Sequence, residues 1–567
     1  MIICGIKLTH DGAVAVIEDG RLRFSIEAEK IANGARYSAL GNLRRVLDLL
    51  ALEGMSPADV DQFVIDGWYT TGVNGNHAIT LNNGDLPVEL AVAPYLESSA
   101  GEDPLKRHHF DADGFGFDGL DGNGFNGRLA YSSYNHVTNH LLGAYCSSPC
   151  AARGEDALAL VWDGGIEPRL YHVRAATCEV TLVSVLLPIT GNSFANFSAQ
   201  FGPYAADLSG MTREEVLQYR LSIAGKAMAY AALGKTEPDA FPLFDDLVAE
   251  FASAQMENAR IMGAKVASNR DELMPGMSDA DIITTFQDYL GTRLLDRLSA
   301  VVKSKFPDQR PNLVLGGGCA LNIKWNTSMR ASGLFRSVFA PPFPNDAGAA
   351  IGTAVCESFH RGNLALLEWD VYSGPSLVAG PTPEGWQARP CDEAQLAQLL
   401  HAEGEPVVVL SGRAELGPRA LGNRSILAPA TDPGMKDRLN AIKNRAGYRP
   451  VAPICLESRA PEVFTPGTPD PYMLFEHRMR PGWAERVPAI VHLDGTARLQ
   501  TINEHSRSAT ARILAAYEEI SGVPVLCNTS ANFEGRGFFP DVASAARWGG
   551  TRRIWSEGVL YTNSVAK

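Results

Sequence analysis

The chain has 567 residues, of which 45% are hydrophobic and 20% charged, and its formal net charge is −14. This length predicts two or three domains, the composition is typical of a soluble globular protein, and the acidic balance argues against a nucleic-acid partner. No apolar run approaches membrane-spanning length, and no signal peptide is expected at the N-terminus. The nine scattered cysteines are expected to be reduced thiols, so the expected location is the cytoplasm.

Two segments of the chain share a strand–turn–strand pattern. The first runs from Ile2 to Ile17 and the second from Ala157 to Val173. The turns hold His10 and Asp11 in the first segment, and Asp163, Gly164 and Gly165 in the second. Paired units of this kind, each with an acidic glycine turn, predict the duplicated halves of an actin-like ATPase or sugar-kinase fold, in which the two turns face a nucleotide.

His10 has two interpretations. A histidine beside an aspartate in a turn is commonly a plain surface residue. An imidazole is also the side chain best suited to accept a proton from an alcohol near neutral pH. We take the second interpretation as the hypothesis.

Residues 101–127 are acidic and rich in glycine and phenylalanine. Their Asp-x-Asp-Gly rhythm suggests calcium, but an EF-hand loop needs a glutamate at its twelfth position, where Gly122 stands. We expect an irregular loop instead, and a lid over an acceptor site is one role for it.

His136 and His140 lie four residues apart, so on a helix their side chains share one face. Most isolated pairs of this kind are incidental. Further along, Lys226 follows a glycine on an expected helix, where a surface lysine is the plain alternative. A glycine triplet that includes Gly317 and Gly318 ends an expected strand, and glycine there lets the backbone approach a phosphate.

A segment rich in proline and glycine, residues 371–392, is the expected linker between a first domain of residues 1–370 and a second of residues 393–567. A helix over 393–402 and a strand over 406–410 are expected to follow.

The stretch from Gly412 to Pro453 gathers cations in an otherwise acidic chain. Glycine recurs there every five residues, and arginine forks match phosphate and carboxylate oxygens two at a time. The combination suits several negative groups held together, such as a nucleotide triphosphate and an acyl phosphate; a solvated loop and helix is the plain alternative. The basic residues are Arg413, Arg419, Arg424, Lys436, Arg438, Lys443, Arg445 and Arg449.

The motif GRAELGPRALGNRSIL, followed by RPVAP, resembles the O-carbamoyltransferases of the nodulation-protein-U and cephem-carbamoylation family, which includes tobramycin carbamoyltransferase. The resemblance extends over nearly the whole chain. It implies an α/β protein whose first domain has the actin-like fold of tRNA threonylcarbamoyl transferases and whose second domain is similar to threonylcarbamoyl-adenylate synthases.

The resemblance also implies residue roles. The implied ligands of a metal, iron(II) in this family, are His136, His140, Asp163 and Asp346. The implied nucleotide or acceptor contacts in the first domain are Asp11, Gly164, Gly165, Lys226, Gly317, Gly318 and Asn322. The implied site for carbamoyl phosphate and ATP, with Mg²⁺, contains Arg419, Arg424, Lys443, Arg449, Met473, His492, Arg498, Asn528 and Ser530. The residues expected to take part in catalysis are His10, Lys443 and Arg449.

The implied reaction has two steps. Carbamoyl phosphate and ATP give carbamoyl adenylate in the second domain, and the carbamoyl group then passes to a hydroxyl of a small molecule, such as an antibiotic, at the metal. The sequence departs from the family at Ala13, which replaces a serine, at Ala531, which replaces a phenylalanine, and at Arg536–Phe539. These last departures are expected to alter a pocket wall.

Three other classes of protein share parts of this pattern. A sugar kinase would leave the 412–453 stretch and the four metal ligands unexplained. A hydrogenase-maturation carbamoyltransferase would need paired CxxC motifs, which are absent from this sequence. A nucleotide-binding regulator without catalysis stays open, as do the acceptor and the oligomeric state, for which a homodimer is one option.

Overall fold

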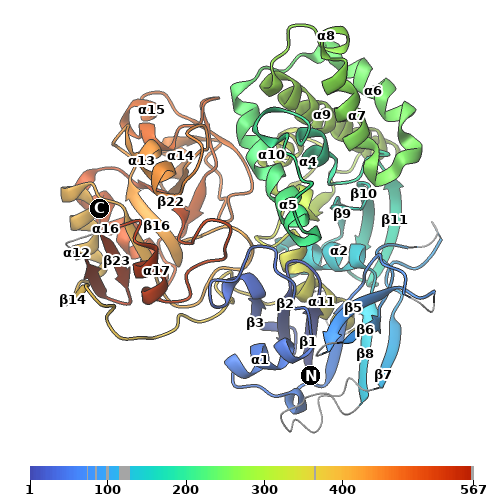
Figure 1. Ribbon diagram of the computed structural model, residues 1–567, viewed down its shortest axis with the longest axis horizontal. Coiled ribbons are helices and arrows are strands. Elements are labelled where there is room, and N and C mark those ends of the chain that lie inside the picture. The colour runs from blue at the N-terminus through green and yellow to red at the C-terminus, as the bar shows by residue number, and fades with distance from the viewer. Residues whose placement is uncertain (73–74, 84–85, 98–100, 114–127, 363–365, 564–567) are drawn as a thin grey trace.

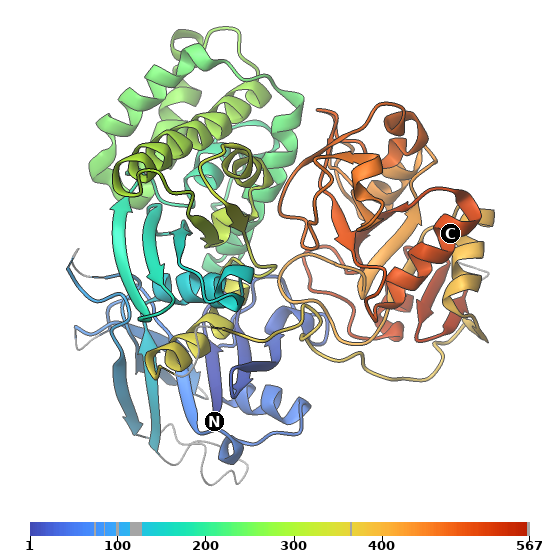
Figure 2. The same ribbon diagram turned by 180° about the vertical axis from the view of Figure 1, so that it is seen from behind.

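The computed structural model describes residues 1–72, 75–83, 86–97, 101–113, 128–362 and 366–563. An N-terminal region, up to residue 362, contains two large sheets, a two-stranded sheet and most of the helices. A C-terminal region, from residue 387 on, is built on one larger sheet (Figures 1 and 2). None of the helices in the described part of the chain is long and apolar enough to cross a membrane.

The first sheet has six strands in the order β3-β2-β1-β4-β8-β7. They are β1 (Ile2–Lys7), β2 (Ala13–Glu18), β3 (Arg21–Glu27), β4 (Gln62–Asp66), β7 (His108–Asp113) and β8 (Arg128–Tyr134). The predicted strands around His10 are confirmed. The prediction of an irregular loop over 101–127 is wrong for residues 108–113, which pair with β8 as an edge strand. Residues 114–127 lie outside the described part.

The second sheet has five strands in the order β11-β10-β9-β12-β13. They are β9 (Ala157–Val161), β10 (Arg169–Arg174), β11 (Glu179–Val185), β12 (Asn312–Gly316) and β13 (Ser337–Phe339). The order of the first five strands in the other sheet, β3-β2-β1-β4-β8, follows the same plan: a three-stranded antiparallel meander, then two parallel additions beside its first strand. The duplication predicted from the sequence is therefore present in the fold.

Helices α2 (His136–Cys146) and α11 (Ala349–His360) lie between the two sheets (Figure 1). A Cβ on Gly5 of β1 would stand 2.0 Å from the carbonyl oxygen of Ala350, so α11 rests directly on that strand. A Cβ on Gly352 would stand 2.1 Å from the carbonyl oxygen of Asn139, so the backbones of the two helices also touch. Only glycine permits these approaches, and they bring the beginnings of both helices to one place beside β1.

A helical layer covers the second sheet on its outer side (Figure 1). Its helices are α4 (Ser193–Ser198), α5 (Arg213–Tyr230), α6 (Phe241–Glu250), α7 (Asn258–Ser268), α8 (Arg270–Leu273), α9 (Asp279–Lys305) and α10 (Ile323–Ala331). The longest of these helices, α9, begins at a capping box formed by Ser278 and Asp281. Phe197 stacks on Phe286 at 3.9 Å between ring centroids in the core of this layer.

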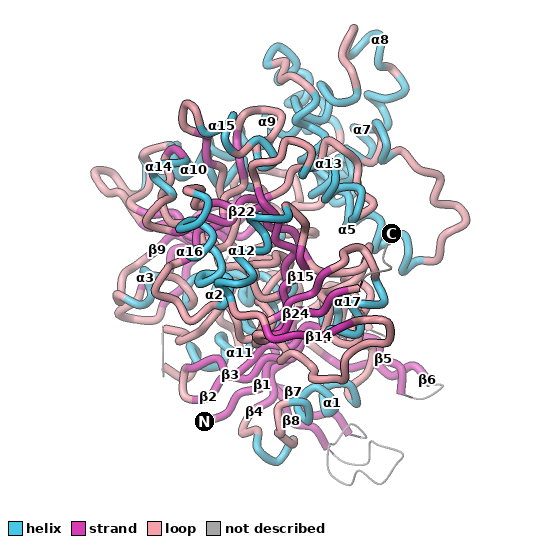
Figure 3. Tube along the Cα trace, turned by 90° about the vertical axis from the view of Figure 1, so that its left-hand side faces the viewer, coloured by secondary structure: helices cyan, strands magenta, loops and turns pink. Residues whose placement is uncertain are grey.

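The C-terminal sheet has eight strands, β14-β24-β23-β15-β16-β22-β17-β21, which form a continuous band beside α12 and α16 (Figure 3). They are β14 (Gln387–Pro390), β15 (Val407–Leu410), β16 (Arg424–Pro429), β17 (Ala452–Leu456), β21 (Gln500–Ile502), β22 (Val525–Ser530), β23 (Arg553–Ser556) and β24 (Val559–Thr562). The helix and strand expected after the linker are α12 (Glu393–Glu403) and β15. β14 lies within the predicted linker and pairs with β24 at the edge of the sheet.

The remaining helices and strands complete the two regions. They are α1 (Arg44–Leu52), α3 (Pro149–Ala152), α13 (Met435–Ile442), α14 (Ala460–Val463), α15 (Trp483–Arg486), α16 (Ala509–Ser521), α17 (Val542–Trp548), β5 (Ala78–Asn83), β6 (Leu86–Ala91), β18 (Phe464–Thr465), β19 (His477–Met479) and β20 (Thr496–Ala497).

Loops of the two regions are joined by hydrogen bonds. The buried Nζ of Lys30 donates to the carbonyl oxygens of Glu415 (2.5 Å) and Gly417 (2.9 Å). The amide of Gly417 donates in turn to Glu27 Oε1 at 2.9 Å. The loop that carries the predicted arginine motif is thus held against the N-terminal region.

Candidate functional site

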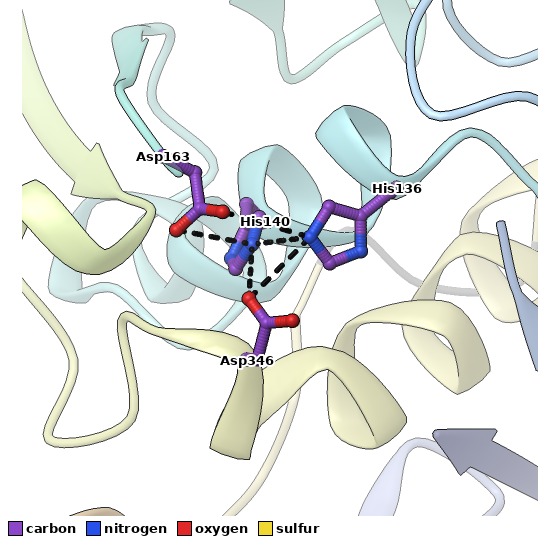
Figure 4. Close-up of side chains that lie close together, drawn as sticks. All are labelled: His136, His140, Asp163 and Asp346. Atoms are coloured by element: carbon purple, nitrogen blue, oxygen red, sulfur yellow. Dashed lines mark hydrogen bonds and ion pairs between the residues drawn. The ribbon is translucent and has the colours of Figure 1, made fainter. Parts of the chain in front are cut away.

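The four predicted metal ligands lie together in the N-terminal region (Figure 4). His136 is the first residue of α2 and His140 lies one turn later, with their Nε2 atoms 3.0 Å apart. Asp163 follows β9, and Asp346 opens the turn before α11. One ligand atom from each of the four buried side chains lies within 4.8 Å of the others. The structure therefore places these residues where one ion could contact all of them.

Neighbouring groups fix which atoms face the centre of this cluster. Asp66, at the end of β4, lies 2.8 and 3.0 Å from His136 Nδ1, which leaves Nε2 to face the other ligands. The amide of Gly318 donates to Asp163 Oδ1 at 2.6 Å, and the hydroxyl of Tyr95 donates to Asp163 Oδ2 at 3.1 Å. Partners of this kind orient the ligands of protein metal sites.

The charges around the cluster favour a cation. Burial and the Asp346 carboxylate raise the pKa of Asp163, but the imidazoles of His140 and His136 outweigh them and lower it to about 2. Burial lowers the pKa of His136, but Asp66 outweighs burial and raises it well above its usual value. The Asp163 carboxylate therefore stays ionised at neutral pH, and positive charge in this space is stabilised.

His10 lies beside the cluster. Its Nδ1 is 2.9 Å from Asp11 Oδ2, and its Nε2 is 3.6 Å from Asp346 Oδ2. The centroids of the His10 and Trp68 rings are 5.5 Å apart. Burial lowers the pKa of His10, but Asp346 and Asp11 outweigh it, so the net shift is upward. Asp11, predicted as a nucleotide contact, is thus placed as the partner that orients the His10 ring.

The turn after β12, which holds Gly317 and Gly318, contacts the turn after β9. Gly317 has φ of 86°, and a Cβ there would stand 2.4 Å from the carbonyl oxygen of Trp162, so the turn after β12 lies against the turn that holds Gly164 and Gly165. Asn322 has a different role from the one predicted. Its Oδ1 accepts hydrogen bonds from two amides in the first turn of α10, so the side chain caps that helix.

A second cluster, which we call the basic cluster, lies where the two regions meet. Its members are Arg419, Lys443, Arg445, Arg449 and Arg498 from the C-terminal region, and Arg36 and Lys226 from the N-terminal region. Burial, followed by repulsion between members, lowers the pKa of Arg419 to about 10 and that of Arg445 to about 9. The Nε atoms of Arg419 and Arg498 are buried without a hydrogen-bond partner, and that of Arg36 lies 3.8 Å from Glu29 Oε2. Unpaired buried donors among like charges are what an anion-binding site requires.

Lys226 was predicted at the nucleotide or acceptor site of the first domain. The structure places it on α5 facing the basic cluster, where burial, followed by repulsion from Arg449, lowers its pKa. Lys226 thus lies in the first domain as predicted, and its contact with a nucleotide or acceptor stays a prediction.

Lys443 follows α13 and points at the end of β22. Its Nζ donates to the carbonyl oxygens of Ser530 (2.9 Å) and Asn532 (2.5 Å) and to Asn532 Oδ1 (2.7 Å). Burial, followed by repulsion from Arg445, lowers its pKa well below the usual value. Arg445 donates to Thr529 Oγ1 at 3.0 Å, so the end of β22 forms a polar edge of the basic cluster.

Arg424 does not belong to this cluster. Its guanidinium donates to the carbonyl oxygens of Ser411 (2.7 Å), Asn423 (2.9 Å) and Gly412 (3.0 Å). The prediction that Arg424 contacts the donor is corrected: the side chain holds the loop that presents Arg419, and these carbonyls occupy its donors.

The other predicted donor contacts surround the basic cluster. Met473 has φ of 59° and packs with Leu421 in a small buried group. Burial lowers the pKa of His492 to about 3, and its Nε2 is buried without a hydrogen-bond partner. Asn528 Nδ2 donates to the carbonyl oxygen of Ala420 at 3.1 Å and so braces the arginine loop.

Sequence reasoning missed several residues of these sites. Arg36 sits in a loop without a motif, and nothing local signals that it reaches the basic cluster. Arg445 was named in the cationic stretch from Gly412 to Pro453 but not among the implied donor contacts, although it is two positions from Lys443. Lys7 also had a signal in the sequence, because it is a charged residue at the end of an otherwise apolar strand. Tyr95 had none.

Family models match most of the chain. The model described as "Carbamoyltransferase N-terminus" matches residues 2–105 and 125–355, and the one described as "Carbamoyltransferase C-terminus" matches residues 397–554. The chain belongs to the carbamoyltransferase family. It is therefore an enzyme, and the resemblance inferred from the arginine motif is confirmed.

Curated relatives cover the whole chain. "Nodulation protein U" of Sinorhizobium fredii is 46% identical over 100% of both chains. "3'-hydroxymethylcephem-O-carbamoyltransferase" of Streptomyces clavuligerus is 31% identical over 98% of this chain and 97% of its own length. A dehydratase activator from Clostridium difficile with bound ADPNP, a solved structure, is 15% identical over 64% of this chain and 97% of its own, with a TM-score of 0.33, too low for a detailed comparison.

Proposed function

We propose that this carbamoyltransferase is ATP-dependent and acts in two steps at two places. Carbamoyl phosphate, water and ATP form carbamoyl adenylate, pyrophosphate and inorganic phosphate at the basic cluster, and the carbamoyl group then passes to a hydroxyl of a small-molecule acceptor beside His10. Residues 1–370 would carry the transfer, 371–392 would link, and 393–567 would form the adenylate. The observation that supports this division is the presence of two unlike clusters, one cationic and one with a metal-ligand set.

The first step requires two anions to approach one another. Lys443 and Arg449 lie in a group of cations whose repulsion is relieved when negative oxygens enter. Water first cleaves carbamoyl phosphate to carbamate and inorganic phosphate. Screening of the phosphate charges in a buried site then favours the attack of a carbamate oxygen on the α-phosphate of ATP, and pyrophosphate leaves as carbamoyl adenylate forms. Mg²⁺ is expected on the ATP. In this scheme Arg449, Arg498 and Arg419 bind, and Lys443 stabilises the developing charge.

The second step uses the cluster of two histidines and two aspartates. This donor set, with its orientated Nε2 atoms and ionised carboxylates, fits a divalent transition metal, and we propose Fe(II). When bound, such an ion supplies Lewis acidity toward the carbamoyl oxygen. His10 Nε2 would take the proton of the acceptor hydroxyl while Asp11 holds the opposite ring nitrogen. AMP leaves as the new C–O bond forms.

The acceptor class follows from a relative's name. A cephem O-carbamoyltransferase aligns with 98% of this chain, so we propose an oxygen acceptor on a natural product. All nine cysteines are free thiols, which suits the reducing cytoplasm, the proposed location.

The product nucleotide distinguishes the alternatives. Purified protein is incubated with ATP, Mg²⁺ and carbamoyl phosphate, and nucleotides are separated by chromatography. The proposal expects pyrophosphate that depends on carbamoyl phosphate, together with carbamoyl adenylate or the AMP that its hydrolysis gives. A kinase of the same fold would release ADP, and a nucleotide-binding regulator would release neither; both results overturn the proposal. Mass spectrometry of hydroxylated natural products, searched for a carbamoyl mass gain, then identifies the acceptor.

A further inference from the structure

Lys7 is a buried cation whose role the transfer scheme leaves open. It ends β1, and its Nζ lies 2.7 Å from Asp66 Oδ2 and 2.8 Å from Asp346 Oδ2. The ammonium also lies 4.4 Å from the centre of the Trp68 ring. Only 1% of the side chain is exposed, and a charge at such depth persists only when it is paired.

Because of the position of Lys7, the two carboxylate oxygens of Asp346 have different partners. Oδ2 faces Lys7, whereas Oδ1 lies 3.4 Å from Nε2 of both His136 and His140. One oxygen of Asp346 is thus directed to the proposed metal position, and the other is taken by a fixed positive charge. Lys7 also pairs with Asp66, which holds His136 from behind. The ammonium therefore stands one carboxylate away from any ion in the cluster.

We propose that Lys7 makes the cluster selective for divalent over trivalent metal ions. This inference rests on the proposed metal site. A fixed unit charge repels a trivalent ion half again as strongly as a divalent ion at the same place, because Coulomb energy is proportional to ionic charge. Removing the charge therefore favours the trivalent ion. For unit charges this close in a buried site, the change in relative affinity is on the order of ten- to a hundredfold.

The proposed selectivity would also affect the oxidation state of bound iron. The ferrous and ferric ions differ by one unit of charge at one position, so Lys7 disfavours the ferric state. The protein would thereby keep the ion in the divalent form that the proposed Lewis-acid chemistry uses, without a change in any ligand.

Redox-silent ions test the selectivity. Dissociation constants of the full-length protein for Zn²⁺ and Ga³⁺, each buffered with nitrilotriacetate, are measured for the wild type and Lys7→Met. The ratio of Ga³⁺ to Zn²⁺ affinity is expected to rise at least tenfold in the variant. Lys7→Gln, which keeps a hydrogen-bond donor but not the charge, is measured in parallel, and its ratio of Ga³⁺ to Zn²⁺ affinity must also rise. If one of the two variants fails to fold, the other still tests the proposal.

Two further variants separate charge from geometry. Lys7→Met combined with Asp66→Asn removes one charge of each sign and is expected to return the ratio toward that of the wild type. Lys265→Met, which removes a surface lysine paired with Glu250, should leave it unchanged. An unchanged ratio in both Lys7 variants overturns the role of Lys7 alone, and so does a double variant that matches the single one. A wild-type protein that binds neither ion overturns the metal site itself.

Discussion

The main-chain amide of Gly537 donates a 3.0 Å hydrogen bond to the carbonyl oxygen of Gly34, which joins the C-terminal region to a loop of the N-terminal region. Beside it, the ring of Phe538 lies 5.1 Å from Lys30 Nζ. Residues 536–539 were expected, from the resemblance, to depart from the family pattern. They were expected to alter a pocket wall, but these contacts place Gly537 and Phe538 at the boundary between the two regions.

Gly537→Ala is expected to destabilise this boundary. The added Cβ would stand 1.9 Å from the carbonyl oxygen of Glu29, so one backbone must move. Overpacking of this kind reduces the free energy of unfolding by about 1–3 kcal/mol, and thermal denaturation measures the loss. Gly380→Ala, where nothing lies within 4 Å of the added atom, is the matched control. Equal melting temperatures for the two variants would contradict the close contact.

Lys443→Ala is expected to reduce AMP formation from ATP and carbamoyl phosphate by roughly a hundredfold or more, because a preorganised charge at the reacting phosphate is lost. Release of pyrophosphate measures the effect. Arg438→Ala, on α13, removes an exposed ion pair with Glu405 and should leave the rate unchanged. A variant of Lys443 with near-normal AMP release would remove this residue from the first step.

His136→Ala is expected to leave pyrophosphate release intact and to abolish transfer to an acceptor. The substitution removes one predicted metal ligand, which is also the partner of Asp66, and leaves every member of the basic cluster in place. Metal content by mass spectrometry should fall together with the carbamoylated product. If pyrophosphate release stops while circular dichroism shows a native fold, the division into two sites is wrong.

Arg36→Met is expected to weaken donor binding although Arg36 belongs to the N-terminal region. A charge-assisted hydrogen bond contributes about 1.5–3 kcal/mol, so the KM for ATP or carbamoyl phosphate in AMP formation should rise roughly ten- to a hundredfold. Arg44→Met, on α1, serves as the control. Unchanged KM values for both substrates would show that the guanidinium of Arg36, which lies 3.8 Å from Glu29 Oε2, faces no substrate.

His492 predicts a dependence of stability on pH. Its pKa is lowered to about 3, chiefly by burial, whereas in the unfolded chain it is about 6.5. Below pH 6.5 the unfolded state therefore binds a proton that the folded state refuses, so stability falls as the pH drops toward 3, by up to about 1.4 kcal/mol per unit. Urea unfolding at pH 7 and 4.5 should show a smaller difference for His492→Gln than for the wild type. His505→Gln, at an exposed position, should match the wild type, and parallel profiles for all three proteins would contradict the assignment.

The sequence predicted the parts of the site that local geometry determines. His136 and His140 share a face because helical spacing places residues four apart together. The paired strand–turn–strand segments predicted the duplicated sheets, because short antiparallel hairpins follow from local turns. The closeness of Asp163 and Asp346, by contrast, came from the resemblance alone.

The sequence did not distinguish between similar residues that face different ways. Arg419 and Arg424 lie in one motif, yet only the first faces the basic cluster. Their directions depend on the turns at Gly417 and Gly422, with φ of 77° and 126°, and on loop carbonyls that accept from Arg424. Arg36 was missed because its neighbours in the basic cluster lie hundreds of positions away, and no periodic pattern reports such a contact.

The close contact between α2 and α11 affects the size of the ion that the cluster of two histidines and two aspartates could hold. A methyl group on Gly352 would stand 2.1 Å from the carbonyl oxygen of Asn139, the residue before His140. Pushing α2 away from α11 would carry the imidazoles away from Asp346 and enlarge the hole that the four donors enclose. A substitution at a glycine that never touches an ion would therefore change which ion fits.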